Sequence, residues 1–599
     1  MKDLFEARLR EADGVNPADV KALSRPELFG LADAIRAFLV ENVVASGGHL
    51  GSNLGVVELT LALHRSFSSP ADRIIWDTGH QAYVHKMLTG RSPDFVRLRR
   101  AGGMSGYPSR KESEHDLVEN SHASTALSYA DGFAKANVVR HVEDRHVVAV
   151  LGDGSLTGGM AWEALNNIGD GRRRVIVVLN DNGCSYSPTI GAVSRRLNES
   201  TGGSGLFEQL GLRYEGPVDG HDVAALEQAF ERAKTVNGPV LVHCRTVKGR
   251  GYPPAEADLV DHHHAVPPQR AKSAPASGRG TWTGAFADEL LELAEDRPDI
   301  VAVTAAMMHP VGLGAFAERH PERVFDVGLA EQHAVTSSAA MAMAGLRPVV
   351  PIYSTFLNRA FDQLLLDCGL HDCPVTFVLD RSGITGEDGP SHHGMWDLSL
   401  LRIVPNMRIS APRDGATLRQ ALRHCLETAT GPTALRFPKG QLPEDLEATV
   451  CDGVDVLHGE AHPSAPRDVL IVAVGVMASE CLSAAEELET EGITVTVVDP
   501  KWVHPLPPAV AAMAADHRVA VSVEDNSRTG GVGTAFLQSL SDQRVTTPAR
   551  TLAIEAAFQP HGSRQALLAG LGLTGSSIAD AARALLCWHV GEQPSSTGR

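Results

Sequence analysis

Short apolar runs that alternate with segments of helical spacing are the main pattern along this chain. The clearest example starts with an apolar run at 147–151, continues with helical spacing over 160–168, and ends with an apolar run at 174–179. This pattern predicts a strand, a crossover helix and a second strand that lie side by side and parallel in one sheet. The strands end in a Gly-Asp-Gly turn at 152–154 and an Asn-Asp-Asn turn at 180–182, so we expect both turns at the same sheet edge.

The oxygen-bearing groups in and after these two turns predict a metal site. Asp153 supplies a carboxylate, Asn182 supplies an amide oxygen, and Cys184 follows with a backbone carbonyl. Such a sparse oxygen set suits Mg²⁺ whose coordination is completed by phosphate oxygens. Either turn alone is typical of an ordinary tight turn, whereas the two together on one strand-helix-strand unit favour a site for a charged cofactor.

Histidines near the ends of predicted elements are further candidates for a binding site. His49 lies in a glycine-rich loop after a predicted helix over 27–44, and His80 follows a predicted strand over 73–77. Glycines let a backbone approach a ligand closely, and the carboxyl ends of strands are the usual place for sites in α/β proteins. Residues 102–119 are polar and contain glycine, which predicts a long mobile loop.

A helix is predicted to begin directly after this loop, near residues 120–126. Its first residues include Ser121, His122, Ala123 and Ser124, which combine hydroxyls with free backbone amides. Such a helix start suits a phosphate group, although capping by Ser121 or Ser124 alone would explain the same pattern.

Changes in composition divide the chain into domains. Residues 265–281 are rich in Pro, Ala, Ser and Gly, and residues 443–467 in Pro, Glu and Asp, which is typical of linkers. Predicted strands and helices alternate on both sides of each linker. We therefore predict an α/β protein of three domains, at 1–264, 282–442 and 468–599.

Two segments of the second domain carry further candidate functional residues. Glu331 begins a helix rich in small residues, although the helix dipole alone also favours an acid in the first turn. Residues 380–394 contain His392 and are too rich in glycine and charge for a core loop. The third domain shows no catalytic constellation.

The composition is that of an ordinary folded protein and excludes several classes. The chain has 599 residues, of which 43% are hydrophobic and 21% charged, so disordered and disulfide-rich classes do not fit. A formal net charge of −18 argues against nucleic acid or an anionic membrane as a partner. The eight cysteines lack metal-binding spacing, and we find neither a signal peptide nor a membrane-spanning apolar run. We therefore expect a cytoplasmic protein with reduced thiols.

Several motifs together resemble those of the transketolase-type thiamine diphosphate enzymes, and within that group those of the 1-deoxy-D-xylulose-5-phosphate synthase family. The paired turns match the fingerprint in which an Asp and an Asn hold the metal that binds the diphosphate. The resemblance extends over nearly the whole chain, and its other motifs are GHQ at 79–81, GDGS at 152–155, KGRGY at 248–252, AEQHAV at 330–335, YSTFL at 353–357 and DGPSHHG at 388–394.

The resemblance implies two thiamine diphosphate-binding domains with parallel sheets, followed by a smaller transketolase C-terminal-like α/β domain. It implies thiamine diphosphate and Mg²⁺ as cofactors, with Asp153, Asn182 and the Cys184 backbone carbonyl as metal ligands. Glu331 is implied to activate the aminopyrimidine ring, and Phe356 to stack on it. The implied cofactor-binding residues are His80, His122, Ala123, Ser124, Gly154, Ser155, Asn182, Trp282, Glu331 and Phe356.

The resemblance also implies the substrates, which are pyruvate, losing CO₂, and D-glyceraldehyde 3-phosphate, whose aldehyde accepts the remaining two-carbon unit. The implied catalytic residues are Glu331, His49, His80 and His392, among which the histidines suit proton transfer because imidazole titrates near neutral pH. Planar arginine side chains suit the phosphate. The implied substrate-binding residues are Tyr353, Arg359, Asp388, His392 and Arg436. The resemblance further implies a homodimer.

Two positions depart from the pattern of many family members. Ala123 stands where many have a serine, which removes one hydroxyl near the diphosphate, and Trp-Thr-Gly at 282–284 replaces a common Tyr-Ser-Lys. Neither change touches the metal ligands, Glu331 or the arginines, so we expect activity to survive. The sequence leaves open a transketolase, a pyruvate dehydrogenase component, or a cofactor-binding protein with an interaction role.

Overall fold

The computed structural model describes residues 2–142, 144–199, 203–268, 280–428 and 430–590. Most of the first predicted linker, residues 269–279, lies outside these ranges. The described chain is an α/β protein with three sheets, as predicted. It divides into two compact units, the first formed by the described residues up to 268 with 305–308 and 326–330, and the second by the remainder.

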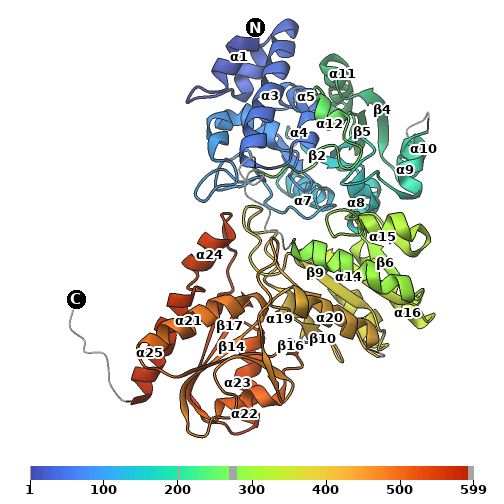
Figure 1. Ribbon diagram of the computed structural model, residues 1–599. Helices are drawn as coiled ribbons and strands as arrows, with labels where there is room; N and C mark the ends of the chain where they lie inside the picture. The colour runs from blue at the N-terminus through green and yellow to red at the C-terminus, as the bar shows by residue number, and fades with distance from the viewer. Residues whose placement is uncertain (1, 143, 200–202, 269–279, 429, 591–599) are drawn as a thin grey trace. The chain divides into compact units, whose positions relative to one another are not determined.

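A five-stranded parallel sheet forms the centre of the first unit (Figure 1). Its order is β1-β2-β3-β5-β4, with β1 (Arg73–Trp76), β2 (Val147–Gly152), β3 (Ile176–Asp181), β4 (Arg213–Asp219) and β5 (Val240–Arg245). Side chains of the central strands point alternately to the two faces of the sheet. Helices cover both faces. One face is covered by α7 (Ala126–Val139) and α8 (Gly159–Asp170), and the other by α5 (Val57–Ser66) and α11 (Val223–Lys234).

The register of this sheet places the two polar turns at one edge, as predicted. Gly152 of β2 pairs with Asn180 of β3, so Asp153 and Asn182 follow at the same carboxyl edge. Strand β1 runs parallel beside β2 and brings Asp77 to that edge as well.

The remaining helices of the first unit include a layer formed by the amino-terminal segment. The predicted helix over 27–44 is α3 (Arg25–Ser46), and it buries Leu28, Leu31 and Ile35 at helical spacing. The others are α1 (Lys2–Arg8), α2 (Pro17–Ala22), α4 (Gly51–Leu54), α6 (Tyr83–Lys86), α9 (Gly191–Leu197), α10 (Ser204–Gln209) and α12 (Pro253–Glu256). Within the described ranges of both units, no helix combines the length and apolar character needed to cross a membrane.

The second unit contains a seven-stranded and a six-stranded sheet. The seven-stranded sheet has the order β16-β10-β11-β9-β8-β6-β7. Its strands are β6 (Ile300–Thr304), β7 (Val324–Asp326), β8 (Arg347–Tyr353), β9 (Thr376–Asp380), β10 (Arg408–Ser410), β11 (Thr433–Arg436) and β16 (Trp502–His504). Its main helices are α14 (Trp282–Asp296), α16 (Glu331–Met343), α19 (Asp397–Leu401) and α20 (Gly415–Glu427).

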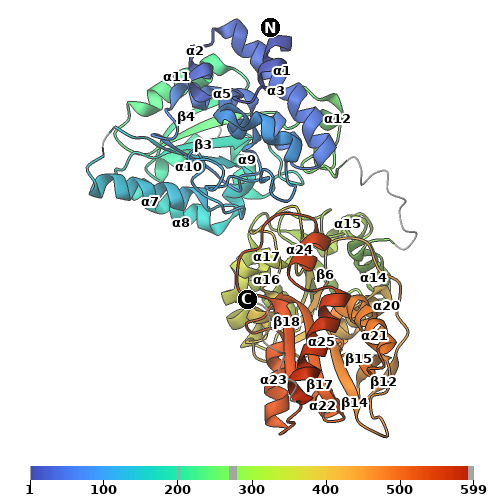
Figure 2. The ribbon, with the colours of Figure 1, turned by 90° about the vertical axis from the view of Figure 1, so that its left-hand side faces the viewer.

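The six-stranded sheet has the order β12-β13-β15-β14-β17-β18. Its strands are β12 (Thr449–Cys451), β13 (Val454–His458), β14 (Arg467–Ala473), β15 (Val495–Asp499), β17 (His517–Ser527) and β18 (Ala549–Ile554). Helices α21 (Ala478–Thr490) and α25 (Gly575–Val590) pack on one face (Figure 2). Helices α22 (Pro508–Ala514) and α23 (Val532–Asp542) pack on the other.

Two details of the second unit differ from the sequence interpretation. Strands β12 and β13 lie within the segment 443–467, where we expected a linker, and β13 pairs with β15. Strand β12 is the short edge strand of this sheet, and the Pro, Glu and Asp around both strands gave the segment the composition of a linker. Strand β16, from the third predicted domain, runs antiparallel to β10 and extends the seven-stranded sheet.

Candidate functional site

Asp153 and Asn182 lie together at the carboxyl edge of the first sheet. The Asn182 backbone N–H donates to Asp153 Oδ1 at 3.4 Å, and the Thr189 hydroxyl donates to Asp153 Oδ2. The Asn182 side-chain oxygen accepts from the Cys184 backbone N–H at 3.1 Å. Burial raises the pKa of Asp153 to about 6, so a bound cation would compensate the cost of its ionised form. This donor set fits Mg²⁺.

Asp77 ties two predicted cofactor-binding segments together, although we did not single it out from the sequence. Its Oδ1 accepts from the Ser124 backbone N–H at 2.8 Å and from Ser155 Oγ at 2.6 Å, and its Oδ2 accepts from the Ala126 backbone N–H at 2.9 Å. Asp77 is 1% exposed, so these bonds are shielded from water. The only local signal was its position at the carboxyl end of a strand.

The segment before α7 forms a turn. The Ser124 side chain does not cap this helix. Its backbone adopts a φ of 71°, and its hydroxyl donates to the Ser155 carbonyl at 2.7 Å. His122 and Ala123 precede it in the same turn, and Gly154 precedes Ser155 in the other segment. All five predicted residues therefore lie on the two segments that Asp77 joins.

Three imidazoles gather in the first unit. The ring centroid of His49 lies 5.5 Å from that of His80 and 5.6 Å from that of His264, and His80 stacks on His264 at 5.1 Å. Burial lowers the pKa of His80 to about 3 and holds the pKa of His264 well below its usual value, so both rings are neutral at pH 7. His80 Nδ1 is buried and has no hydrogen-bond partner among the described residues. His80 therefore suits hydrogen bonding to a ligand better than proton donation.

His264 belongs to a tract of three histidines at 262–264 and was not among the candidate residues selected from the sequence. The tract has no regular metal-ligand spacing, and only tertiary packing reveals that its last ring meets His49 and His80.

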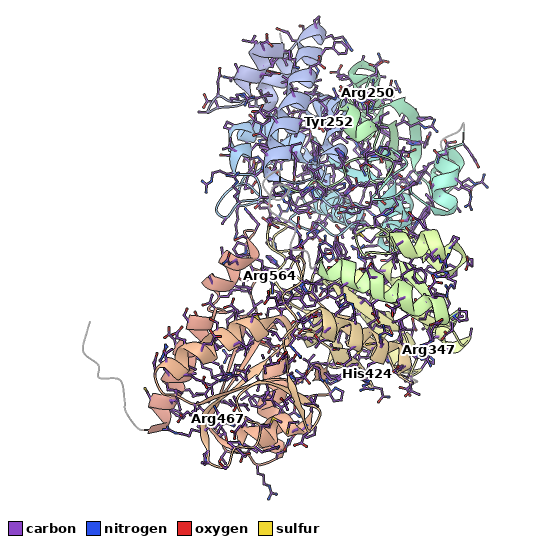
Figure 3. All side chains as sticks on the ribbon, in the orientation of Figure 1. Arg250, Tyr252, Arg347, His424, Arg467 and Arg564 are labelled. Carbon is purple, nitrogen blue, oxygen red and sulfur yellow. The ribbon has the colours of Figure 1, made fainter. Side chains whose placement is uncertain are left out.

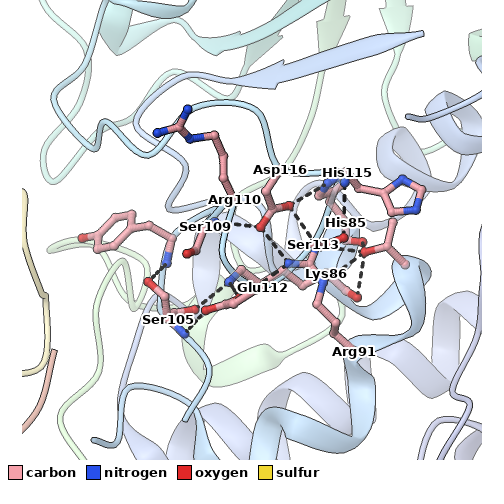
Figure 4. A network of polar contacts seen from close by, with 12 residues as sticks. His85, Lys86, Arg91, Ser105, Ser109, Arg110, Glu112, Ser113, His115 and Asp116 are labelled. Atoms are coloured by element: carbon pink, nitrogen blue, oxygen red, sulfur yellow. Dashed lines mark hydrogen bonds and ion pairs between the residues drawn. The ribbon is translucent and has the colours of Figure 1, made fainter. Parts of the chain in front are cut away.

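Two buried ion pairs fasten the loop at 102–119, which the sequence predicts to be mobile (Figure 4). Lys86 Nζ donates to Glu112 Oε2 at 2.5 Å, and the two Nη atoms of Arg91 donate to Asp116 at 2.7 and 2.9 Å. Backbone N–H groups of the loop donate to the same two carboxylates. The Lys86 and Asp116 side chains are completely buried. The acidic residues of this polar loop thus hold it in place through basic partners that lie earlier in the chain.

We expect Arg91→Met to lower the free energy of unfolding by about 3 to 5 kcal/mol, because it leaves the Asp116 carboxylate buried without its guanidinium partner. Arg196→Met is the matched control, since Arg196 is 65% exposed and pairs with Glu199 at 2.8 Å on the surface. Its loss should change stability by less than about 1 kcal/mol. Urea unfolding of both variants measures the difference, and equal effects would contradict a stabilising role for the Arg91 pair.

Glu331 begins α16 in the second unit and is 6% exposed. Burial raises the pKa of its carboxyl above the usual range. Arg359 Nη1 lies 3.6 Å from Glu331 Oε2, and this oxygen makes no hydrogen bond in the described part of the chain. The helix dipole favours an acid at this position, but a buried oxygen without a donor is costly unless a ligand supplies one. The arrangement fits a carboxyl that hydrogen-bonds a nitrogen of a bound ring.

Aromatic rings lie at and after the carboxyl ends of β8 and β9 in the seven-stranded sheet. Phe356 stacks on Tyr353 with centroids 5.5 Å apart and planes inclined by 14°, and His392 meets Phe356 edge-on at 5.7 Å. The Arg381 guanidinium lies 3.8 Å from the Tyr353 ring centroid. We did not select Arg381 from the sequence, where its one signal is a position directly after the apolar run that forms β9; in the structure its backbone φ is 59°.

The predicted acceptor residues occupy different surroundings in the second unit. Asp388 pairs with Lys439 at 3.5 Å, whereas Arg359 lies beside Glu331. Arg436 ends β11 and is 4% exposed. Its Nε donates to Asp397 Oδ2 at 2.9 Å, and its Nη2 has no hydrogen-bond partner among the described residues.

Trp-Thr-Gly at 282–284 is one of the two departures from the pattern that the sequence otherwise resembles. Trp282 is 2% exposed and stacks on Phe437 with centroids 6.1 Å apart. Thr283 Oγ1 donates to Asp380 Oδ2 at 2.7 Å, one residue before Arg381. This segment therefore packs α14 against the ends of β9 and β11.

Known proteins resemble this chain over nearly its whole length. The family model described as 1-deoxy-D-xylulose-5-phosphate synthase matches residues 13–205 and 198–246, that of the transketolase pyrimidine binding domain matches 279–444, and that of the transketolase C-terminal domain matches 460–578. A 1-deoxy-D-xylulose-5-phosphate synthase of Frankia casuarinae is 53% identical, with 94% of this chain and 93% of the relative covered. Two proteins named 1-deoxy-D-xylulose-5-phosphate synthase 1, from Kitasatospora griseola and Streptomyces coelicolor, are each 53% identical, with 94% of this chain and 93% or 92% of the relative covered, respectively.

Proposed function

Because this chain belongs to the 1-deoxy-D-xylulose-5-phosphate synthase family, we propose that it converts pyruvate and D-glyceraldehyde 3-phosphate into 1-deoxy-D-xylulose 5-phosphate and CO₂. The observation that carries the proposal is 53% identity to synthases of that name over 94% of the chain. Thiamine diphosphate, when bound, supplies the electron sink that decarboxylation of a 2-oxo acid requires. The product is a precursor for isoprenoids, thiamine and pyridoxal.

The residues that would hold the diphosphate end of the cofactor lie in the first unit. Asp153, Asn182 and the Cys184 carbonyl would hold Mg²⁺, which would supply the positive charge that a diphosphate requires. His80 would donate or accept a hydrogen bond near the cofactor as a neutral imidazole, in agreement with its buried Nδ1. The turns that Asp77 joins would line the diphosphate with His122, Ala123, Ser124, Gly154 and Ser155.

The residues that would hold the ring end lie in the second unit. Glu331 would hydrogen-bond the aminopyrimidine and keep it in the form that activates the cofactor, and Phe356 would stack on the ring. Trp282 would support this end through its packing on Phe437. We propose three domains close to the predicted bounds 1–264, 282–442 and 468–599, with the start of the third moved ahead of β12, because β12 and β13 belong to its sheet.

The remaining predicted residues would serve the substrates. His49 and His392 would hold or pass protons, because imidazole titrates near neutral pH. Tyr353, Arg359 and Asp388 would line the acceptor. Arg436 would bind the phosphate of the acceptor. The supporting observation is its buried Nη2, which makes no hydrogen bond to a described residue.

We expect Arg436→Lys to raise the KM for D-glyceraldehyde 3-phosphate by about 10- to 100-fold, because lysine keeps the charge but loses the planar fork. The lysine variant is preferable to alanine, since alanine would leave Asp397 and Asp525 buried without this cation. The KM for pyruvate should stay within about twofold. Steady-state kinetics with each substrate varied in turn measure both, and an unchanged KM for the phosphorylated aldehyde would show that Arg436 is only structural.

Product identification by NMR tests the proposed function. The purified protein is mixed with thiamine diphosphate, Mg²⁺, pyruvate and D-glyceraldehyde 3-phosphate, and we expect 1-deoxy-D-xylulose 5-phosphate with one CO₂ per product. A transketolase would instead transfer a ketol unit without release of CO₂. Binding of both cofactors without turnover of any 2-oxo acid and aldehyde pair would favour an interaction role.

We further propose a cytoplasmic homodimer. Helix α16, the neighbouring π-helix η6 (Leu364–Gly369) and the residue after η6 expose large apolar side chains, with Met343 59%, Leu366 48% and Leu370 72% exposed. Apolar surface of this kind is typical of protein interfaces. Light scattering after gel filtration measures the mass, and Met343→Glu should shift a dimer toward the monomer.

A further inference from the structure

The six-stranded sheet contributes side chains to the segment that carries two predicted acceptor residues. We define this segment, residues 381–396, as the acceptor loop. Asp525 of β17 is 1% exposed, and it accepts hydrogen bonds from Arg436 Nη1 at 3.3 Å and from Arg564 Nη2 at 2.7 Å. Arg564 is the first residue of α24 (Arg564–Gly570; Figure 3), and its Nη1 donates to the Ile384 carbonyl at 2.8 Å. One buried carboxylate thus connects Arg436 to the arginine that holds the acceptor loop.

The backbone of the acceptor loop is shaped to receive Asp525. Gly383 adopts a φ of 71°, and a Cβ at this position would collide with Asp525 Oδ2. Only glycine meets both requirements without strain. The contact therefore depends both on glycine at position 383 and on the buried Asp525 side chain.

A second attachment links the acceptor loop to the segment before α24. His393 is 1% exposed, and its Nδ1 accepts from the Thr385 backbone N–H at 3.1 Å. Its Nε2 therefore carries the proton and donates to the Pro560 carbonyl at 3.1 Å. The Gly562 backbone N–H also donates to the Gly386 carbonyl at 3.3 Å.

The opposite side of the acceptor loop is held by the segment that follows β8. Thr355 Oγ1 donates to the Ser391 carbonyl and Ser354 Oγ to the Gly394 carbonyl, both at 3.1 Å. This segment forms α17 (Ser354–Leu357), which also carries Phe356. The loop is therefore clamped between the predicted ring-binding segment and the six-stranded sheet.

Asp525 also fixes the orientation of the Arg436 guanidinium. Its Nε is held by Asp397 and its Nη1 by Asp525, which leaves Nη2 as the donor without a partner among the described residues. A planar group held at two of its three nitrogens cannot rotate, so the direction of the third is set. Such preorganisation improves the binding of an anion because less freedom is lost on association.

We propose that Asp525 and Arg564 are positioning residues, through which the third domain sets the affinity for the phosphate of the acceptor aldehyde. The inference rests on the proposed function, which gives Arg436 and Asp388 their acceptor roles. Neither Asp525 nor Arg564 needs to touch the substrate, because they act through Arg436 and the acceptor loop.

Arg564→Met and Asp525→Asn test the proposal in the full-length protein with its cofactors. We expect each to raise the KM for D-glyceraldehyde 3-phosphate by about tenfold or more, with kcat and the KM for pyruvate within about twofold. Turnover of unphosphorylated D-glyceraldehyde should change little, and Arg564→Lys should recover part of the loss. Arg528→Met is the matched control, because Arg528 is 57% exposed and pairs with Glu555 at 3.0 Å in the same domain.

Hydrogen exchange of the acceptor loop provides a readout that does not depend on activity. Peptides within 382–394 should exchange about tenfold faster in Arg564→Met than in the wild type or in Arg528→Met. Unchanged exchange, or equal losses with phosphorylated and unphosphorylated aldehyde, would overturn the inference. A wild-type protein without turnover would count against the proposed function instead, while the exchange rates would still decide whether Arg564 positions the loop.

Discussion

Glu331→Ala is expected to lower kcat by about 10²- to 10⁴-fold while thiamine diphosphate binding stays measurable. The carboxyl is buried at the first residue of α16, where burial raises its pKa and Oε2 makes no hydrogen bond to a described residue. Its removal deletes the group that would activate the ring but leaves the proposed metal and diphosphate ligands in place. Steady-state rates and calorimetric titration with thiamine diphosphate measure the two effects separately.

Two further variants make this result specific. Glu331→Gln keeps the size of the side chain and one hydrogen-bonding oxygen, so a comparable loss of kcat would show that the carboxyl itself is needed. Glu318→Ala removes an exposed acid from the short helix α15 (Gly314–Arg319) and should leave the rate unchanged. A wild-type rate in Glu331→Ala would contradict the role assigned to this residue.

The sequence predicts best those parts of the site that depend on neighbouring elements of the chain. Asp153 and Asn182 follow two strands joined by one helix; the handedness of such a unit is nearly invariant, and its strands are usually neighbours. Their meeting at one sheet edge is confirmed by the pairing of Gly152 with Asn180. The fold class is also confirmed, and the two apolar runs of this unit became the buried strands β2 and β3.

Residues that act across long stretches of chain escaped the sequence interpretation. Asp77 meets Ser155 from 78 positions away, and Arg436 meets Asp525 from 89 positions away. No local pattern marks such partners, because side-chain meetings of this kind follow from how sheets and helices pack. The third domain had no catalytic constellation of its own, yet Asp525 joins the surroundings of Arg436.

Burial also changes the chemistry that residue type alone suggests. A histidine at a strand end suggests a proton donor, but the lowered pKa of His80 makes it neutral at working pH. The polar loop at 102–119 suggests mobility, but Arg91 and Lys86 neutralise its acids in a buried network. The sequence neighbours of a histidine do not show whether its ring is buried. Those of a carboxylate do not show which residue pairs with it.

Asp153→Ala is expected to weaken Mg²⁺-dependent binding of thiamine diphosphate by about 100-fold or more, because it removes the only carboxylate proposed as a metal ligand. Asp153→Asn removes the negative charge but keeps the size and shape of the side chain. Its amide oxygen can still accept from the Asn182 backbone N–H, and its amide N–H can donate to the Thr189 hydroxyl oxygen in place of the bond that Asp153 accepts, so the variant should preserve the fold while still losing most of the metal affinity.

Asp170→Ala is the matched control for this last prediction, since Asp170 is the exposed last residue of α8 in the same strand-helix-strand unit. Calorimetric titration with thiamine diphosphate at fixed Mg²⁺, repeated at several Mg²⁺ concentrations, gives the affinity and its metal dependence. The wild type and Asp170→Ala should bind more tightly as Mg²⁺ rises, whereas Asp153→Ala should respond weakly. The same metal dependence in all three proteins would place the metal elsewhere, because a site without its carboxylate has little to hold a divalent cation.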